Sequence, residues 1–137
     1  MTNDVTTLSA GARERLDTES VVWLTTVNAT GEPIPTPVWF VWLDDELWIR
    51  SQPTGAKVAH AAGNPHVALN LNSDRTGGDV VVLNGTAKVE EAMPGAVWDA
   101  YERKYADQIT GLGYTPTSFA DDYSTTLRVT VGRVRAW

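Results

Sequence analysis

The chain has 137 residues, with 17 acidic against 11 basic side chains and no cysteine. The acidic balance argues against nucleic-acid binding, which needs clustered cations, and no apolar run approaches the roughly 20 residues that span a bilayer. The length suits a single core, and the lack of thiols excludes disulfides and favours the cytoplasm, so we expect one domain over residues 1–137, flexible at residues 1–7.

Short runs of alternating or β-branched apolar residues follow one another along the chain, and each predicts a β-strand. The strands are expected at residues 20–27, 37–43, 46–51, 66–72, 80–90 and 127–136. Helices are expected at residues 8–17, 56–62, 94–110 and 116–122. Because the turns are short and strands do not alternate regularly with helices, we expect a small antiparallel β-barrel of six strands with helices packed outside it.

Proline and glycine mark irregular places in these strands. Pro33 and Pro35 predict an extended segment at a sheet edge, because proline has no N–H to donate to a neighbouring strand. An interruption is expected at Asn84-Gly85. In the last strand the apolar alternation changes phase at Gly132, which predicts a β-bulge there.

Side chains that usually carry catalysis are scarce. His60 and His66 are the two histidines, and no carboxylate lies between them. No G-x-S-x-G nucleophile elbow occurs, and Gly55-Ala-Lys57 lacks the spacing of a P-loop. The sequence therefore predicts no catalytic side chain and no metal site.

One stretch does indicate a binding site. No carboxylate occurs in residues 47–73, a segment that holds Arg50 and Lys57. The expected strand ends at Ser51, a turn with proline and glycine follows, and Lys57 lies in the first turn of the next helix, whose N-terminus offers free N–H groups. These pieces predict a phosphate-binding turn. The alternative is a solvated turn whose cations balance acids elsewhere.

The same pieces resemble the signature of the FMN-binding split β-barrel superfamily, the pyridoxamine 5'-phosphate oxidase-like proteins. The resemblance rests on a strand ending in Ser51, on Lys57 opening a helix, and on Asn64-Pro65 before the next strand, and it covers residues 19–137. Within the superfamily the chain is most similar to the flavin/deazaflavin oxidoreductases of the B class, many of which use coenzyme F420. The resemblance implies a mainly β fold with flanking helices, a six-stranded antiparallel split β-barrel.

The resemblance also implies a homodimer with the cofactor at the subunit interface. The residues that it implies at the cofactor are Thr36, Pro37 and Val38 along the ring, Arg50, Ser51 and Lys57 at the phosphate, and Gly55 and Ala56 in the turn between them. FMN-using oxidases of the superfamily often carry arginine directly before the phosphate lysine, where this chain has Ala56. The missing cation favours F420 over FMN.

A reductase of this kind passes a hydride from reduced deazaflavin to an electron-poor small molecule such as an enone or a quinone, so it needs no nucleophilic side chain. Of the 6 tryptophans, Trp39 is the one that we expect near the cofactor or substrate. Two alternatives stay open. One is an FMN-dependent oxidase or reductase of the same fold, and the other is a non-enzymatic protein that binds or carries a cofactor.

Overall fold

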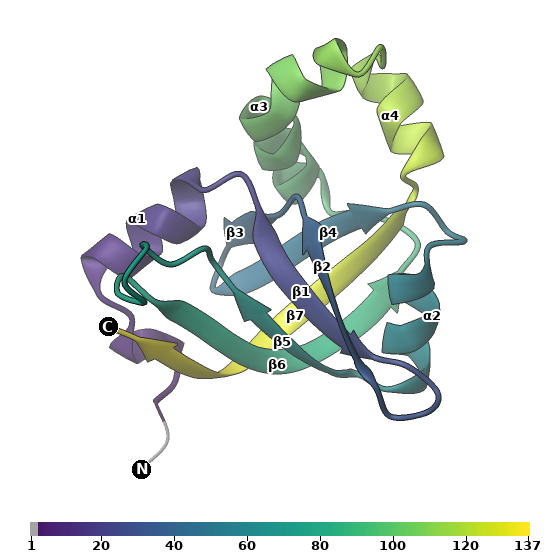
Figure 1. Ribbon diagram of the computed structural model, residues 1–137. Helices are drawn as coiled ribbons and strands as arrows, with labels where there is room; N and C mark the ends of the chain where they lie inside the picture. The colour runs from purple at the N-terminus through teal and green to yellow at the C-terminus, as the bar shows by residue number, and fades with distance from the viewer. Residues whose placement is uncertain (1–2) are drawn as a thin grey trace.

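The computed structural model of the protein describes residues 3–137, which form one curved antiparallel sheet flanked by helices (Figure 1). The strands are β1 (Val22–Val27), β2 (Pro33–Val38), β3 (Val41–Leu43), β4 (Glu46–Ser51), β5 (His66–Asn70), β6 (Val81–Glu90) and β7 (Thr125–Ala136). The helices are the 3-10 helix η1 (Val5–Thr7) and the α-helices α1 (Ala10–Thr18), α2 (Ala56–Gly63), α3 (Gly95–Gly111) and α4 (Pro116–Asp122). In the described residues the strand order is β2-β1-β5-β6-β7-β4-β3. The mainly β class with flanking helices is confirmed, with seven strands in place of six.

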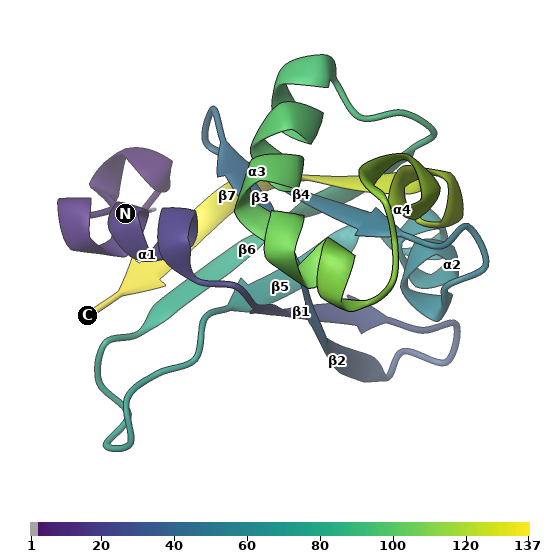
Figure 2. The same cartoon turned by 90° about the horizontal axis from the view of Figure 1, so that it is seen from above.

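The sheet curves around the main hydrophobic core. Aliphatic side chains from several strands fill this core, among them Leu24, Leu47, Ile49, Leu69 and Leu127. Figures 1 and 2 place α1 at one end of the sheet and α2 at the other, with α3 and α4 standing together over β3 and β4. α3 contacts both β3 and α4. These two helices, residues 95–122, form an arm that projects from the sheet, and we call it the α3–α4 arm.

The seventh strand arises because residues 37–43, expected as one strand, form two. β2 ends at Val38 and pairs with β1, whereas β3 starts at Val41 and pairs with β4. Between them, the Phe40 N–H donates to the Tyr105 hydroxyl at 2.9 Å, and that hydroxyl donates to the Ser20 carbonyl at 2.8 Å. The single-strand prediction is wrong because a distant tyrosine takes the backbone hydrogen bond that a continuous ladder would have used.

The bulge expected in the last strand is confirmed. The pairing of β6 with β7 shifts from Asn84↔Arg133 to Gly85↔Val131, which leaves Gly132 as the extra residue. β6 itself continues through Asn84-Gly85 as one strand, and the irregularity expected there is the register shift between these two residues. A Cβ at residue 85 would lie 2.3 Å from a carbonyl oxygen of β7, which is why this close crossing requires glycine.

β2 forms one edge of the sheet, as its prolines predict. Pro33, Pro35 and Pro37 alternate along it with residues that have an N–H, and every one of them is paired with a β1 residue. Because proline cannot donate, the ladder bonds to β1 come from the residues between the prolines, and the backbone of each proline faces away from β1. The side of β2 that faces away from β1 therefore presents the carbonyl oxygens of the prolines and no N–H groups where it pairs with β1.

The start of the chain packs on the sheet. Residues 1 and 2, part of the segment 1–7 expected to be flexible, lie outside the described residues. The Asn3 carbonyl accepts a hydrogen bond from the Val134 N–H at 2.8 Å, and η1 follows. The Ser9 side chain caps α1 by accepting from the Ala12 N–H at 3.1 Å. Across residues 3–137, no helix has both the length and the apolar character that crossing a membrane requires.

Candidate functional site

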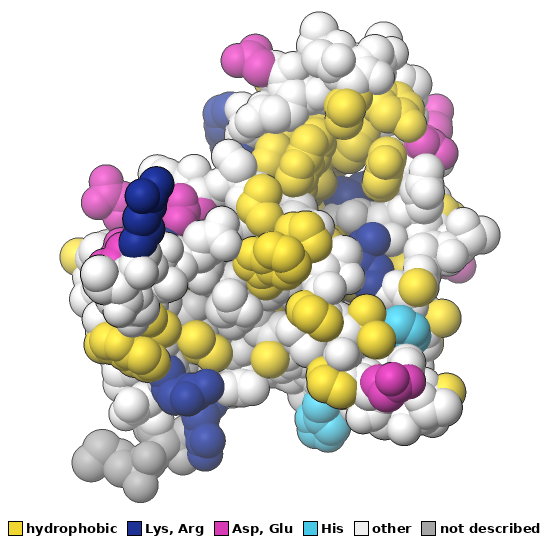
Figure 3. All heavy atoms as spheres, viewed as in Figure 1, with side chains coloured by type: hydrophobic (Ala, Val, Ile, Leu, Met, Phe, Trp, Pro, Cys, Tyr) yellow, Lys and Arg dark blue, Asp and Glu magenta, His cyan; other side chains and the backbone are white. Residues whose placement is uncertain are grey.

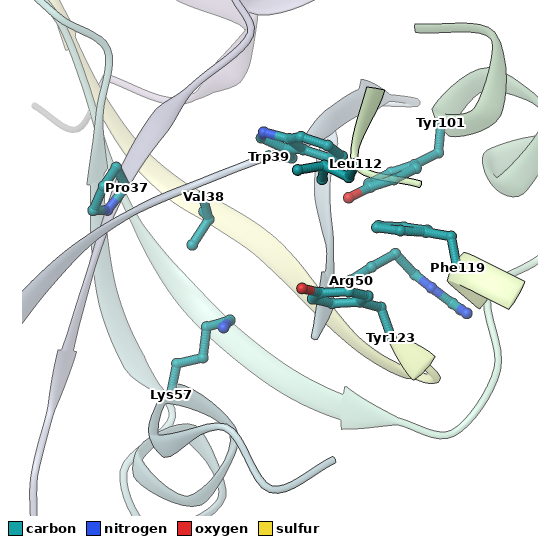
Figure 4. Close-up of a pocket in the computed structure, with 9 residues that line it drawn as sticks. All are labelled: Pro37, Val38, Trp39, Arg50, Lys57, Tyr101, Leu112, Phe119 and Tyr123. Carbon is teal, nitrogen blue, oxygen red and sulfur yellow. The ribbon is translucent and has the colours of Figure 1, made fainter. Parts of the chain in front are cut away.

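A pocket of about 180 Å³ lies where β2, β4, α2 and the α3–α4 arm meet (Figure 4). Its lining divides into a strand wall of Pro37, Val38 and Trp39, a basic wall of Arg50 and Lys57, and an aromatic wall of Tyr101, Phe119 and Tyr123. A polar, charged end and an apolar, aromatic end thus share one small volume. Concave sites that bind organic ligands combine such surfaces.

Lys57 supplies the exposed charge of the basic wall. It lies in the first turn of α2, whose N-terminus has Gly55 as its cap residue and no side chain that caps it. No carboxylate among residues 3–137 forms an ion pair with Lys57, and partial burial lowers the pKa of its amine. A half-buried cation beside free helix N–H groups is suited to bind an anion.

The turn before α2 is packed too tightly for a side chain at its centre. A Cβ on Gly55 would lie 2.8 Å from Ser51 Oγ and 3.6 Å from Lys57 Nζ. Ser51 is fully buried, and its hydroxyl donates to the Gln52 carbonyl at 2.9 Å. Glycine therefore lets the backbone approach Lys57 closely, while Ser51 braces the turn from behind.

Arg50 faces a different direction from Lys57. Its guanidinium donates to the Ala120 carbonyl at 3.0 Å and to Thr126 Oγ1 at 3.3 Å, and it lies 5.3 Å from the centre of the Trp98 ring. Figure 4 shows the charged end turned away from Lys57, so that mainly the stem of the side chain borders the pocket. Arg50 thus ties α4 to β4 in this conformation, and burial lowers its pKa.

The stretch without acidic residues has an acidic neighbour in space. Asp122, at the end of α4, accepts hydrogen bonds from the Gln52 amide at 3.2 Å and from the Tyr114 hydroxyl. The stretch is therefore free of carboxylates in the sequence but not in space, because the α3–α4 arm brings Asp122 to Gln52. Asp122 does not line the pocket itself.

The aromatic wall continues into a second hydrophobic cluster. Trp39 stacks on Tyr105 with ring centres 4.7 Å apart and planes 4° from parallel, and it lies 5.8 Å from the Phe119 ring. Phe119 in turn stacks on Tyr123 at 4.6 Å. Trp39, the tryptophan expected near the site, therefore lines the pocket and packs against the α3–α4 arm.

Comparison with known proteins identifies the family. Residues 8–137 match the pyridoxamine 5'-phosphate oxidase family, which is nearly the whole chain. The protein belongs to this family. No curated protein matches the chain.

Solved structures share the fold of this family member at low sequence identity. A conserved hypothetical protein from Mycobacterium tuberculosis is 19% identical with a TM-score of 0.74, and the match covers 100% of this chain and 89% of that one. The heme storage protein HutZ from Vibrio cholerae is 16% identical with a TM-score of 0.70, covering 90% of each chain. A structure described as an F420 reductase is 19% identical with a TM-score of 0.67, covering 94% of this chain and 97% of that one. At these identities the likeness shows the fold alone.

The expected cofactor residues of this pyridoxamine 5'-phosphate oxidase family member fall into two groups. The pocket is lined by Pro37, Val38, Arg50 and Lys57 and is not lined by Thr36, Ser51, Gly55 and Ala56. The sequence missed the aromatic wall. Tyr101 and Tyr105 follow Val97 at intervals of four, and this spacing signals only a buried helix face. Nothing local tells which strand such a face will meet.

Proposed function

We propose that this protein is a coenzyme F420-dependent oxidoreductase that transfers a hydride from reduced deazaflavin to an electron-poor small molecule such as an enone or a quinone. The observation that carries the proposal is Lys57, a half-buried cation with no ion-pair partner in residues 3–137, facing a pocket with an aromatic far wall. A protein of the same fold that is described as an F420 reductase supports it.

The residues present fit a phosphorylated ring coenzyme. Lys57 would bind the phosphate as a point charge, helped by the free N–H groups at the start of α2, and Gly55 and Ser51 would hold the turn in place. The outward carbonyls of Pro35 and Pro37 would accept a hydrogen bond from the ring's polar edge. The coenzyme supplies the hydride chemistry when bound, and the protein supplies binding, orientation and exclusion of water.

Ala56 favours the deazaflavin over FMN. FMN-using oxidases that the chain resembles often carry arginine at this place, and here an exposed alanine leaves Lys57 as the single cation of the turn. Weaker binding of the phosphate suits F420 if it is exchanged between turnovers. It suits FMN less if FMN stays bound through many turnovers. An FMN-dependent enzyme is the runner-up, because the same turn could hold its phosphate.

The proposal includes a homodimer. The pocket of about 180 Å³ is smaller than the several hundred Å³ typical of sites that enclose an organic ligand, so a second copy would complete it. Figure 3 shows apolar side chains spread over the face that carries β1, β2 and the inner side of the α3–α4 arm. Trp23 and Val27 of β1 are partly exposed, and Leu112 at the end of α3 is 61% exposed. Sedimentation should give a dimer, and a stable monomer would contradict this part of the proposal.

A carrier function is the second candidate. The pocket contains no histidine or carboxylate for acid–base work, and the heme storage protein HutZ has the same fold. A carrier would bind the coenzyme and turn over no enone or quinone, whereas one clear turnover would exclude it. The cytoplasmic location stays a prediction from the cysteine-free composition.

The decisive experiment is a side-by-side titration of the purified protein with F420 and FMN, followed by fluorescence. We expect F420 to bind more tightly, and Lys57→Ala to weaken its binding about 10- to 100-fold, because a charge-assisted bond is lost. Lys88→Ala is the matched control, because its side chain is 77% exposed on β6. No F420 binding at concentrations up to tens of micromolar would overturn the proposal.

A further inference from the structure

The hydroxyl of Tyr101 belongs to a largely buried side chain that lines the pocket. The side chain is only 1% exposed, it lines the pocket, and no hydrogen bond within residues 3–137 involves its oxygen. Figure 4 shows this oxygen turned toward the interior of the pocket, on the side of Trp39 and Phe119. A hydroxyl that faces a pocket and bonds no protein group is free to bond the pocket's occupant.

The hydroxyl of the next tyrosine on the same face of α3 differs from that of Tyr101. Tyr105 is also buried, but its hydroxyl accepts from the Phe40 N–H at 2.9 Å and lies 2.8 Å from the Ser20 carbonyl. That hydroxyl is used by the fold. The hydroxyl of Tyr101, one turn earlier, has no such structural role.

The surroundings of Tyr101 make its hydroxyl a hydrogen-bond donor. Burial raises the pKa of this phenol far above its ordinary value, so it keeps its proton at any physiological pH. Among the charged groups, the positive charge of Arg50 acts in the opposite direction and favours negative charge at the same place. A stable O–H donor near a cation is best matched by an acceptor that gains negative charge.

We propose that Tyr101 donates a hydrogen bond to the carbonyl oxygen of the substrate, which makes the substrate class a conjugated carbonyl compound. This inference rests on the proposed function. Hydride addition to the β-carbon of an enone moves the C=C electron pair toward the carbonyl and leaves an enolate oxygen, which the Tyr101 O–H stabilises. A proton from solvent then adds to the α-carbon, so that the C=C bond gains one hydride and one proton in total.

Binding to the coenzyme-free protein tests the contact without any turnover. The probes are 2-methyl-1,4-naphthoquinone and 2-methylnaphthalene, which share their shape and differ in the two carbonyls, and tryptophan fluorescence reports binding. Tyr101→Phe should weaken the quinone roughly three- to tenfold, the usual effect of one hydrogen bond, and leave the hydrocarbon unchanged. Tyr114→Phe is the matched control, because its hydroxyl bonds Asp122 outside the pocket lining.

The carbonyl stretch of the bound quinone provides a second readout. It should fall to lower wavenumber on binding to the unaltered protein, and the shift should disappear in Tyr101→Phe. Equal weakening of both probes by Tyr101→Phe, or no shift in the unaltered protein, would overturn the inference even if F420 binds. If the protein binds the quinone selectively through Tyr101 but does not bind F420, the proposed coenzyme is wrong and the carbonyl-binding site still holds.

Discussion

The basic wall and the aromatic wall of the pocket are built in different ways. The basic wall comes from one short segment, residues 50–57, at the end of a strand and the start of α2. The aromatic wall comes from the α3–α4 arm, and Tyr101 and Phe119 are at once pocket lining and members of the second hydrophobic cluster. The difference teaches that changes at Lys57 in the first wall should affect binding alone, whereas changes in the second wall should affect binding and stability together.

The largest expected effect is the difference in the free energy of unfolding between a variant of the aromatic wall and a variant of the basic wall. Phe119 is 2% exposed and stacks on Tyr123, so Phe119→Ala should lower the free energy of unfolding by about 3–5 kcal/mol in urea denaturation. Lys57→Ala should change it by no more than about 0.5 kcal/mol, because its amine has no hydrogen bond or ion pair in residues 3–137. Similar losses for both variants would break the comparison.

Tyr105 should stabilise the chain next to the strand wall through its hydrogen bond with the Phe40 backbone. Tyr105→Phe leaves the buried Phe40 N–H without its partner, so we expect a loss of about 1–3 kcal/mol in the free energy of unfolding. Tyr114→Phe removes an exposed hydroxyl and serves as control. Should the two variants unfold at the same urea concentration, Tyr105 does not hold the break between β2 and β3.

The strand wall should bind a ligand more tightly when the ligand's ring carries a hydrogen-bond donor. The probe is 5-deaza-FMN, which has a phosphate for Lys57 and an imide N–H on its ring, and its N3-methyl derivative lacks that N–H. If the carbonyls of Pro35 and Pro37 accept from the ring, methylation should weaken binding roughly three- to tenfold in a fluorescence titration. Lys57→Ala should weaken both probes by the same factor. Tolerance of the methyl group would contradict the role of these carbonyls.

A further effect concerns pH. Burial lowers the pKa of Lys104 from 10.5 to about 8, and its amine donates to the Phe40 carbonyl at 2.9 Å. Between these two values the unfolded chain binds more protons than the folded one, so this group makes the protein more stable as pH rises from about 8 toward 10.5 and least stable below that window. Lys104→Met should flatten the rise in urea midpoints over this range. The exposed Lys88→Met should leave the rise intact.

The sequence predicts those parts of the molecule whose causes are local. The strand end, turn and helix start around Lys57 follow from neighbouring residues, and so does the bulge at Gly132, where the apolar phase changes. The break at Phe40 could not be predicted because Tyr105, 65 residues away, makes it. The direction of Arg50 depends in the same way on Ala120, which only the docking of α4 brings near.

Both ends of the sheet resist growth by a further strand. β2 presents prolines there, which offer a new strand no donors, and β3 at the opposite end has only three residues, Val41–Leu43. Strand exchange and fibril-like stacking both require a free, regular edge, and neither end provides one. Association of this protein with another chain is therefore expected to use side-chain contacts in place of an added strand.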